Sequence, residues 1–350
     1  MNNLEKEHIS VDVKNLDLTI IIVNYKSCKL VTDCIESVYR ETSRHSFEIV
    51  VVDNDSGDNC REVLSVSFPE VKWLQMGYNS GFARANNAAI RIARGKNVLL
   101  LNSDTIVLNR ALDKVLDLFE KDSQAVACGV QLLNTDGSHQ ISGAHFVKGG
   151  FNFLLPLPYL GRFIRYWGYK LKTRVPSITS VQEKVSVDWI VGAFLMARSE
   201  VVDKAGLLDE DFFMYAEEIE WCSRLRKQGD MYLYGEPQVI HLGGATSGDY
   251  YDTTENENGK NLWNKKGRQV MLSMMVRIRK QYGVFWFLIM LGIFIVEIPI
   301  FAVGVLIEKI FKRKVTFSWK NLSNYIENLG CVFNHFTRII NNKPYFYKTG

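Results

Sequence analysis

The sequence predicts an α/β fold built on a mostly parallel sheet, and three features carry that prediction. Residues 18–23 and 47–52 are dominated by apolar, β-branched side chains, with Thr19 and Glu48 as the exceptions, which is typical of strands covered on both faces. Between them, residues 28–41 repeat apolar side chains at helical spacing. Each apolar run ends in a short polar turn. Strands and helices that alternate in this way build a parallel sheet flanked by helices.

The later elements follow from the same patterns in chain order. Residues 71–74 predict a short strand, and residues 79–94 predict a helix that Gly95 caps. The strand that ends at residue 101 delivers Asp104 to the sheet edge, where a hard cation with oxygen ligands could bind. The remaining expected elements are a helix over 110–121, a strand over 125–130, a strand-like segment over 187–198, helices over 199–205 and 217–228, and a strand over 231–240.

Polar residues gather where the predicted strands end. Tyr25, Asp53 and Asp104 each follow an apolar run, and residues 79–87 open a helix after another. Ligands of such sheets lie beyond the carboxyl ends of the strands, so we expect a binding site there. The first strand is not followed by GxGxxG, and GxxxxGK[ST] is absent from the sequence. The dinucleotide fingerprint and the P-loop are therefore excluded.

The charge distribution divides the chain into two parts. The formal net charge is +4, yet residues 260–350 carry a net charge of +12 and residues 1–259 a net charge of −8. A basic tail on an acidic body argues against a duplex nucleic-acid binder and suits a domain tethered to an anionic membrane. The six cysteines form no CxxC pair or zinc spacing, which indicates free thiols in a reducing compartment. The N-terminus has no apolar core, so we expect no secretory signal and a cytoplasmic catalytic part.

Two later segments suggest contact with a membrane. Residues 145–184 mix aromatic residues with basic ones, six of them Lys/Arg between Phe146 and Val181, and both a packed surface excursion and an interfacial patch remain open. Residues 263–281 predict a basic amphipathic helix. Residues 284–307 form an apolar span interrupted by Glu297 and Pro299, long enough to cross a bilayer. Basic flanks on both sides favour two cytoplasmic ends, which would suit a re-entrant hairpin bent at Glu297. A single span also remains possible. The alternative to membrane attachment is a helical hairpin buried in the protein core.

Seven motifs, in their order and spacing, resemble family 2 glycosyltransferases of the GT-A fold. They are TIIIVNYKS, EIVVVDNDSGD, NSGFARANN, LLLNSDT, DWIVGAFLMARSE, GLLDEDFFMYAEEIEWCSRLRKQG and HLGGATS. The resemblance covers roughly residues 17–282 and is strongest to the bacterial rhamnosyltransferase-like enzymes of O-antigen, capsule and cell-wall glycan assembly. It implies a GT-A sheet with a C-terminal membrane-associated helical region. We expect an extension at 1–17, a glycosyltransferase domain at 18–262 divided at residue 130, and a basic tail at 263–350.

The resemblance implies a nucleotide-sugar site in the first half of the chain. Asp53 would accept a hydrogen bond from the imide N–H of uracil or thymine, and Tyr25 would stack on that base or flank it. The GFxxxxN segment of the family lies over the nucleotide sugar, and its counterparts here are Asn79, Gly81, Arg84 and Asn87.

The resemblance also implies a metal site. Asp104 matches the last acid of the DxD-type motif, whose first position here is Asn102, so one carboxylate remains. His241 matches the histidine that completes the site in related enzymes. Mg²⁺ or Mn²⁺ bound there would stabilise the charge of the leaving nucleoside diphosphate, and the histidine slightly favours manganese.

The second half of the resemblance supplies a base and an acceptor site. The family motif FMYGEDVDLC reads FMYAEEIEWC here, which places Glu218 at the position of the catalytic base and Glu217 beside it as the alternative. Asp188 and Trp189 would border the acceptor sugar.

These features together predict an inverting glycosyltransferase at the cytoplasmic face of a bacterial inner membrane. It would transfer a sugar, foremost rhamnose from dTDP-rhamnose, though a UDP-sugar fits the same contacts, to a polyprenyl-diphosphate-linked glycan. A non-catalytic sugar-nucleotide-binding scaffold protein is the alternative. A nucleotidyltransferase would need a Gly/Arg/Lys-rich loop after the first strand, and residues 24–29 do not form one.

Overall fold

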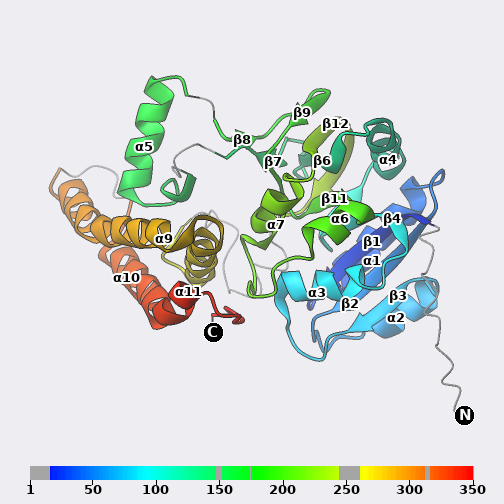
Figure 1. Ribbon diagram of the computed structural model, residues 1–350, viewed down its shortest axis with the longest axis horizontal. Coiled ribbons are helices and arrows are strands. Elements are labelled where there is room, and N and C mark those ends of the chain that lie inside the picture. The colour runs from blue at the N-terminus through cyan, green and yellow to red at the C-terminus, as the bar shows by residue number, and fades with distance from the viewer. Residues whose placement is uncertain (1–15, 147–151, 174, 244–260, 312–315, 350) are drawn as a thin grey trace, which may run out of the picture.

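The predicted α/β fold is confirmed by a computed structural model of the chain (Figure 1). The structure describes residues 16–146, 152–173, 175–243, 261–311 and 316–349. Within these residues a large mixed sheet with helices on both faces forms one part, and a group of helices forms the other. Figure 1 shows that this helical group lies at the opposite end of the molecule from β2 and β3.

Four parallel strands form the first half of the main sheet. β1 (Leu16–Asn24) lies between β2 (Phe47–Asp53) and β4 (Gly95–Leu101), and β3 (Lys72–Gln75) pairs with β2. In this register Asn24 lies opposite Asp53, so the polar ends of two neighbouring strands meet at one edge of the sheet.

The second half of the sheet is mixed. β11 (Phe194–Arg198) runs antiparallel between β4 and β6 (Ala125–Leu133). β12 (Asp230–His241) is parallel to β6 and antiparallel to β5 (Thr105–Val107) and β9 (Lys184–Ser186). Because His241 pairs with Thr105, the end of β12 lies beside the turn that carries Asp104. A separate small sheet joins β10 (Trp189–Ile190), β7 (Gly143–Ala144) and β8 (Ser177–Ile178).

Helices cover both faces of the main sheet. One face packs against α1 (Cys28–Glu41), α2 (Cys60–Ser67) and α4 (Ala111–Lys121), and the other against α3 (Gly81–Ile90), α6 (Ser199–Ala205) and α7 (Glu217–Leu225). The central strands are therefore buried on both sides, which explains their unbroken apolar runs.

The helix expected over 79–94 is shorter than predicted, and Gly95 does not cap it. α3 ends at Ile90, and Gly95 is the first residue of β4. The Gly95 amide donates a hydrogen bond to the Thr19 hydroxyl at 2.8 Å, and a Cβ on Gly95 would lie 2.3 Å from the Thr19 nitrogen. The glycine therefore permits the close approach of β4 to β1.

The helical group comprises α5 (Tyr159–Lys170), α9 (Lys265–Ile310), α10 (Trp319–Asn334) and α11 (Phe336–Asn341), which share a separate apolar core. Gly283, at φ 86°, interrupts the helical geometry of α9. We call residues 265–282 the first arm and residues 284–310 the second arm. Among the described residues, α9 alone is long and apolar enough to cross a membrane, by length and composition.

The second arm continues as helix through Glu297 and Pro299. The hairpin bend that the sequence allowed at Glu297 is therefore wrong, because the chain does not reverse there. The Glu297 carboxylate instead accepts hydrogen bonds from the Tyr159 and Leu160 amides at the start of α5. An acid in the middle of an apolar helix thus satisfies the exposed N–H groups of a second helix.

Candidate active site

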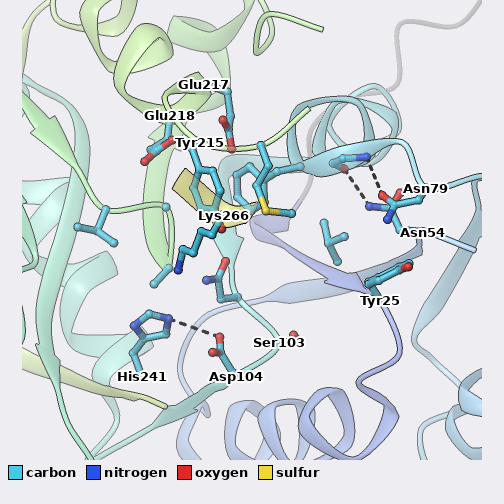
Figure 2. Close-up of a pocket in the computed structure, with 18 residues that line it drawn as sticks. Tyr25, Asn54, Asn79, Ser103, Asp104, Tyr215, Glu217, Glu218, His241 and Lys266 are labelled. Carbon is cyan, nitrogen blue, oxygen red and sulfur yellow. Dashed lines mark hydrogen bonds and ion pairs between the residues drawn. The ribbon is translucent and has the colours of Figure 1, made fainter. Parts of the chain in front are cut away.

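A pocket opens at the carboxyl ends of the central strands and contains most of the predicted site residues (Figure 2). Figure 2 shows Asp104 and His241 at one side of this pocket and Glu217 and Glu218 at the other. The predicted residues that line it are Tyr25, Asn79, Gly81, Asn102, Asp104, Glu217, Glu218 and His241.

Asp104 and His241 form the first pair of side chains in this pocket. The Asp104 carboxylate is buried, and its Oδ1 atom lies 3.5 Å from Nε2 of His241. The two residues are also joined through the backbone, because the Leu242 amide donates to the Asp104 carbonyl at 2.9 Å. The pairing of β12 with β5 therefore fixes the distance between these two potential ligands.

Gln140, which the sequence did not single out, sets the proton position on His241. The Gln140 side-chain amide donates to the His241 carbonyl at 2.6 Å and to Asn134 at 2.7 Å, so its oxygen faces Nδ1 of His241 at 2.9 Å. Nδ1 must then donate its proton to Gln140, which leaves the lone pair of Nε2 directed at Asp104. A metal-binding histidine typically has this arrangement.

The Asp104–His241 pair fits a divalent cation in part. Carboxylate oxygen and imidazole nitrogen are suitable ligands for Mn²⁺, and oxygen suits Mg²⁺. Within the described part of the chain, three or more acidic, histidine or cysteine side chains do not gather anywhere in a metal-binding arrangement. The protein thus offers two ligands here, and a bound substrate would have to supply others.

Glu217 and Glu218 begin α7 at the opposite side of the pocket. The two residues before them, Tyr215 and Ala216, have φ values of 68° and 71°, which is unusual for residues with a side chain. This turn directs the first residues of α7 into the pocket. Burial and the Glu218 carboxylate raise the pKa of Glu217 well above its usual value, and one Glu217 oxygen has no partner among the described residues. Burial also raises the pKa of Glu218.

Arg277, on the first arm of α9, opposes the shift at Glu218. The Arg277 guanidinium is buried, stacks at 4.6 Å on the Phe153 ring, and has its pKa lowered to about 10 by burial. Its positive charge lowers the pKa of Glu218. The Arg277 charge therefore makes Glu218 the better candidate for a carboxylate that accepts a proton.

Asp53 lies beneath the pocket rather than in its lining. Its buried carboxylate accepts hydrogen bonds from Asn24 at 2.8 Å, Gln75 at 2.7 Å and the Ser56 amide at 3.1 Å. Tyr25, one residue beyond β1, does line the pocket. The predicted contact of Asp53 with a nucleobase stays a prediction.

The start of α3 forms the floor of the pocket beside Tyr25. Asn54, a residue the sequence did not single out, accepts from the Ser80 amide at 3.1 Å and donates to the Gly81 carbonyl at 2.9 Å. The Asn79 side chain accepts from the Gly81 amide at 3.2 Å. Next to Gly81, the Phe82 amide donates to the Phe213 carbonyl at 2.9 Å and thereby links the two halves of the sheet domain.

Arg84 and Asn87 lie outside the pocket lining. The Arg84 guanidinium donates to the Glu210 carbonyl at 3.0 Å and stacks at 3.9 Å on the Phe346 ring near the C-terminus. Asn87 is buried and exchanges two hydrogen bonds with the Leu208 backbone. Both side chains join α3 to the segment before α7, and their predicted contacts with a donor stay predictions.

Asp188 and Trp189 also lie outside the pocket lining. Asp188 accepts a hydrogen bond from the Phe146 amide at 2.9 Å and lies 3.6 Å from Arg226, while Trp189 belongs to the small sheet. Neither residue lines the pocket with Glu218, and their contact with an acceptor stays a prediction.

Lys266 is a charged pocket residue that sequence reasoning missed. It comes from the first turn of α9, and its amine lies 5.5 Å from the Tyr215 ring centre. Burial lowers the pKa of Lys266. Figure 2 shows its side chain directed toward the Asp104–His241 side of the pocket. The signal available in the sequence was only its place in a basic helix, which indicated a membrane instead.

The arrangement supplies two chemical functions at opposite sides of one pocket. Asp104, His241 and Lys266 can hold a metal ion and an anionic group. Glu218 can take a proton from a substrate hydroxyl.

The chain is similar in sequence to known glycosyltransferases. The model of the family described as glycosyl transferase family 2 matches residues 19–186. The low-salt glycan biosynthesis hexosyltransferase Agl10 of Haloferax volcanii is 29% identical over 64% of this chain and 66% of its own length. The N-acetylglucosaminyl-diphospho-decaprenol L-rhamnosyltransferase of Mycobacterium tuberculosis is 25% identical over 64% of this chain and 75% of its own. This chain thus spans slightly less than two thirds of the Haloferax relative.

Among solved structures, the crystal structure of GalNAc-T7 with UDP, GalNAc and Mn²⁺ is similar in fold. It superposes with a TM-score of 0.50 at 15% identity, over 80% of this chain and 54% of the other.

Proposed function

Residues 19–186 belong to glycosyl transferase family 2, and from this premise we propose that the protein transfers a sugar from a nucleoside diphosphate donor to a hydroxyl of a lipid-linked glycan. The observation that supports this most directly is the pocket itself, which has Asp104 and His241 at one side and Glu217 and Glu218 at the other. Transfer to a hydroxyl needs stabilisation of a leaving anion and a base, and these two pairs are suited to those roles.

In the proposed reaction the Glu218 carboxylate takes the proton of the acceptor hydroxyl. The freed oxygen forms a bond to the anomeric carbon on the face opposite the diphosphate. The bond from that carbon to the diphosphate oxygen breaks, and the nucleoside diphosphate leaves with the electron pair. A single displacement of this kind inverts the configuration of the sugar.

Asp104 and His241 would hold Mg²⁺ or Mn²⁺ together with the donor phosphates, and Lys266 would contact the same phosphates. A bound divalent ion supplies charge stabilisation for the departing diphosphate. The His241 tautomer set by Gln140 supports this assignment, because it leaves Nε2 free to bind a cation.

The donor and acceptor are proposed from the relatives. The name of the mycobacterial relative specifies rhamnose and a decaprenol diphosphate acceptor. We extend this to a dTDP- or UDP-sugar, foremost dTDP-rhamnose, with Tyr25 and Asp53 beside the base. The proposed catalytic domain comprises residues 18–262, and the basic region 263–350 attaches it to the cytoplasmic face of the bacterial inner membrane.

The test uses the purified full-length protein with a set of UDP- and dTDP-sugars and polyprenyl-diphosphate-linked N-acetylglucosamine in detergent, with Mg²⁺ or Mn²⁺. Mass spectrometry should show one donor consumed, its nucleoside diphosphate released, and one sugar added to the lipid. Glu218→Gln should lower kcat by roughly 10²- to 10⁴-fold. Glu200→Gln, an exposed acid on α6, is the matched control.

Two outcomes would contradict the proposal. Full activity of Glu218→Gln would remove Glu218 as the base. Nucleotide-sugar binding without turnover of any donor would instead support a scaffold protein of a polysaccharide assembly complex.

A further inference from the structure

The helical group carries an extensive apolar surface that the described residues do not cover. On the second arm of α9, the exposed apolar side chains recur along one side of the helix over its whole length, about 40 Å at 1.5 Å per residue. This stripe comprises Phe285, Leu288, Ile295, Val296, Val303, Leu306, Ile307 and Ile310. Exposed apolar surface of this extent on a protein marks an interaction site.

The opposite side of the second arm packs on protein. Its buried residues recur at helical spacing and face α5, α10 and α11: Phe287, Met290, Leu291, Phe294, Glu297, Phe301 and Val305. The Tyr325 hydroxyl of α10 donates to the Phe294 carbonyl at 2.9 Å. The Tyr159 ring of α5 lies so close to Gly304 that a Cβ there would meet it at 2.3 Å. The second arm is therefore fixed to α5 and α10 along its length.

These contacts are incompatible with a transmembrane orientation of the second arm. If the arm crossed a bilayer, Glu297 would lie near its centre, and the start of α5 and the irregular residues 154–158 would lie there with it. Charged side chains and irregular backbone are costly at that depth, even where protein covers them. Neither partner helix can cross, because α5 and α10 are about 18 and 24 Å long, short of the roughly 30 Å of the hydrocarbon core.

α5 has the composition of a helix at a membrane surface. Phe163, Tyr166 and Trp167 are exposed, and their rings form edge-to-face contacts with one another. The Lys170 amine lies 5.7 Å from the Tyr166 ring centre, and Leu171 follows as a further exposed apolar residue. Aromatic rings beside basic groups are suited to the headgroup region of a bilayer.

Basic residues accompany the apolar surface on all three helices. Arg165 and Lys170 on α5, Lys309 on α9 and Lys320 on α10 are exposed. The region from residue 260 onward has a net charge of +12, which complements an anionic membrane.

We propose that α5, the second arm of α9 and α10 dock together on one leaflet of an anionic bilayer, with the second arm lying in the membrane plane and not crossing it. We call this set of helices the docking layer. The inference rests on the membrane attachment proposed above and is independent of the sugar chemistry. In this arrangement the docking layer binds the bilayer reversibly, in place of a transmembrane anchor.

The first test measures binding to lipid vesicles. The full-length protein should float with vesicles of phosphatidylcholine mixed with phosphatidylglycerol, and more weakly with phosphatidylcholine alone. Replacing Phe163 and Trp167 by serine should weaken binding at least about tenfold. Replacing Arg165 and Lys170 by glutamine should weaken binding to the anionic vesicles by about fivefold per charge.

The matched control for the charge variant is Lys121→Gln with Lys204→Gln, two exposed lysines at the ends of α4 and α6. It should bind vesicles as the unmodified protein does. Equal loss in the control and in the α5 variant, or vesicle binding unaffected by the aromatic replacements, would overturn the proposal. The proposal would also be overturned if the protein did not bind vesicles and instead formed oligomers. The apolar surface would then be an interface between copies of the chain.

The second test distinguishes docking from crossing. In sealed inverted membrane vesicles from expressing bacteria, Lys343→Cys, exposed beyond the second arm and outside the docking layer, should react with a membrane-impermeant maleimide without detergent. Ser65→Cys, exposed on α2, is the control that reacts in either case. Mass spectrometry of the labelled peptide separates these positions from native cysteines. Reaction of Lys343→Cys only after detergent is added would establish a transmembrane arm and overturn the proposal.

Failure here is distinguishable from failure of the proposed function. A protein that docks as described but transfers no sugar to a detergent-solubilised acceptor contradicts the proposed reaction alone. One that transfers the sugar but fails the vesicle or labelling test contradicts the docking layer alone.

Discussion

Replacement of Gly81 by alanine tests whether the junction between the two halves of the sheet domain shapes the pocket. Gly81 has φ 73°, and a Cβ there would lie 2.1 Å from the Phe213 carbonyl oxygen. The left-handed backbone costs an alanine roughly 1–2 kcal/mol, and the overlap with the backbone adds roughly 1–3 kcal/mol as for other overpacked sites. We expect Gly81→Ala to lower the free energy of unfolding by about 2–5 kcal/mol.

Gly57 provides a matched control for this substitution. It has φ 65°, but a Cβ there would meet nothing within 4 Å. Gly57→Ala should therefore cost only the backbone contribution of roughly 1–2 kcal/mol. The difference between the two variants isolates the contact with Phe213.

Urea titration followed by tryptophan fluorescence measures both losses, and calorimetric titration with UDP or dTDP measures the pocket. Because the Phe82 amide bonds to the Phe213 carbonyl and Asn54 to the Gly81 carbonyl, Gly81→Ala should also weaken nucleotide binding. Equal destabilisation of the two variants with unchanged nucleotide affinity would refute this reasoning.

Three further predictions concern the polar pairs of the pocket. Gln140→Leu, which removes the acceptor for Nδ1 of His241, should weaken Mn²⁺ binding by about 10- to 100-fold in an EPR titration, and unchanged affinity would contradict the assigned tautomer. Glu217→Gln should gain stability relative to the unmodified protein as pH rises above 4.5. The pKa of Glu217 is raised in the folded state, so above pH 4.5 the carboxyl ionises more readily in the unfolded chain, which destabilises the unmodified protein. A glutamine does not ionise, so the variant escapes this loss. A difference in melting temperature that does not change with pH would refute this. The raised pKa of Glu218 should shift the acid limb of the pH–rate profile above 4.5, and a rate still constant at lower pH would exclude Glu218 as the base.

Much of the fold was predictable because strands that are buried on both faces have mainly apolar sequences. The unbroken apolar runs of β1, β2 and β4 reflect a sheet covered on both faces, and α1 spans residues 28–41 as predicted. Gly95 was misassigned because a glycine after a helix resembles a cap, whereas here it permits contact between two strands. The residue that Gly95 contacts, Thr19, lies 76 residues earlier in the chain, so no local sequence pattern reveals the contact.

The site was predictable at strand ends and less so elsewhere. Asp104 and Glu218 stand at the ends of recognisable elements and line the pocket. Gln140 and Lys266 could not be found in this way, because their roles depend on side chains brought together by β12 and by the start of α9. Asn87 shows the opposite case, a predicted ligand residue that lies outside the pocket lining. The family motif predicted a ligand contact, whereas in the structure its side chain forms two hydrogen bonds with the Leu208 backbone.

The length of the first arm of α9 has a consequence for the size of the acceptor. Its first arm begins at the pocket with Lys266 and ends at Gly283, where the docking layer begins, and it is about 27 Å long at 1.5 Å per residue. A rigid helix of this length limits the distance between the bilayer surface and the acceptor hydroxyl in the pocket. On the docking proposed above, the protein would therefore act on short glycan stems early in chain growth, and a long glycan would carry its free end past the reach of the pocket.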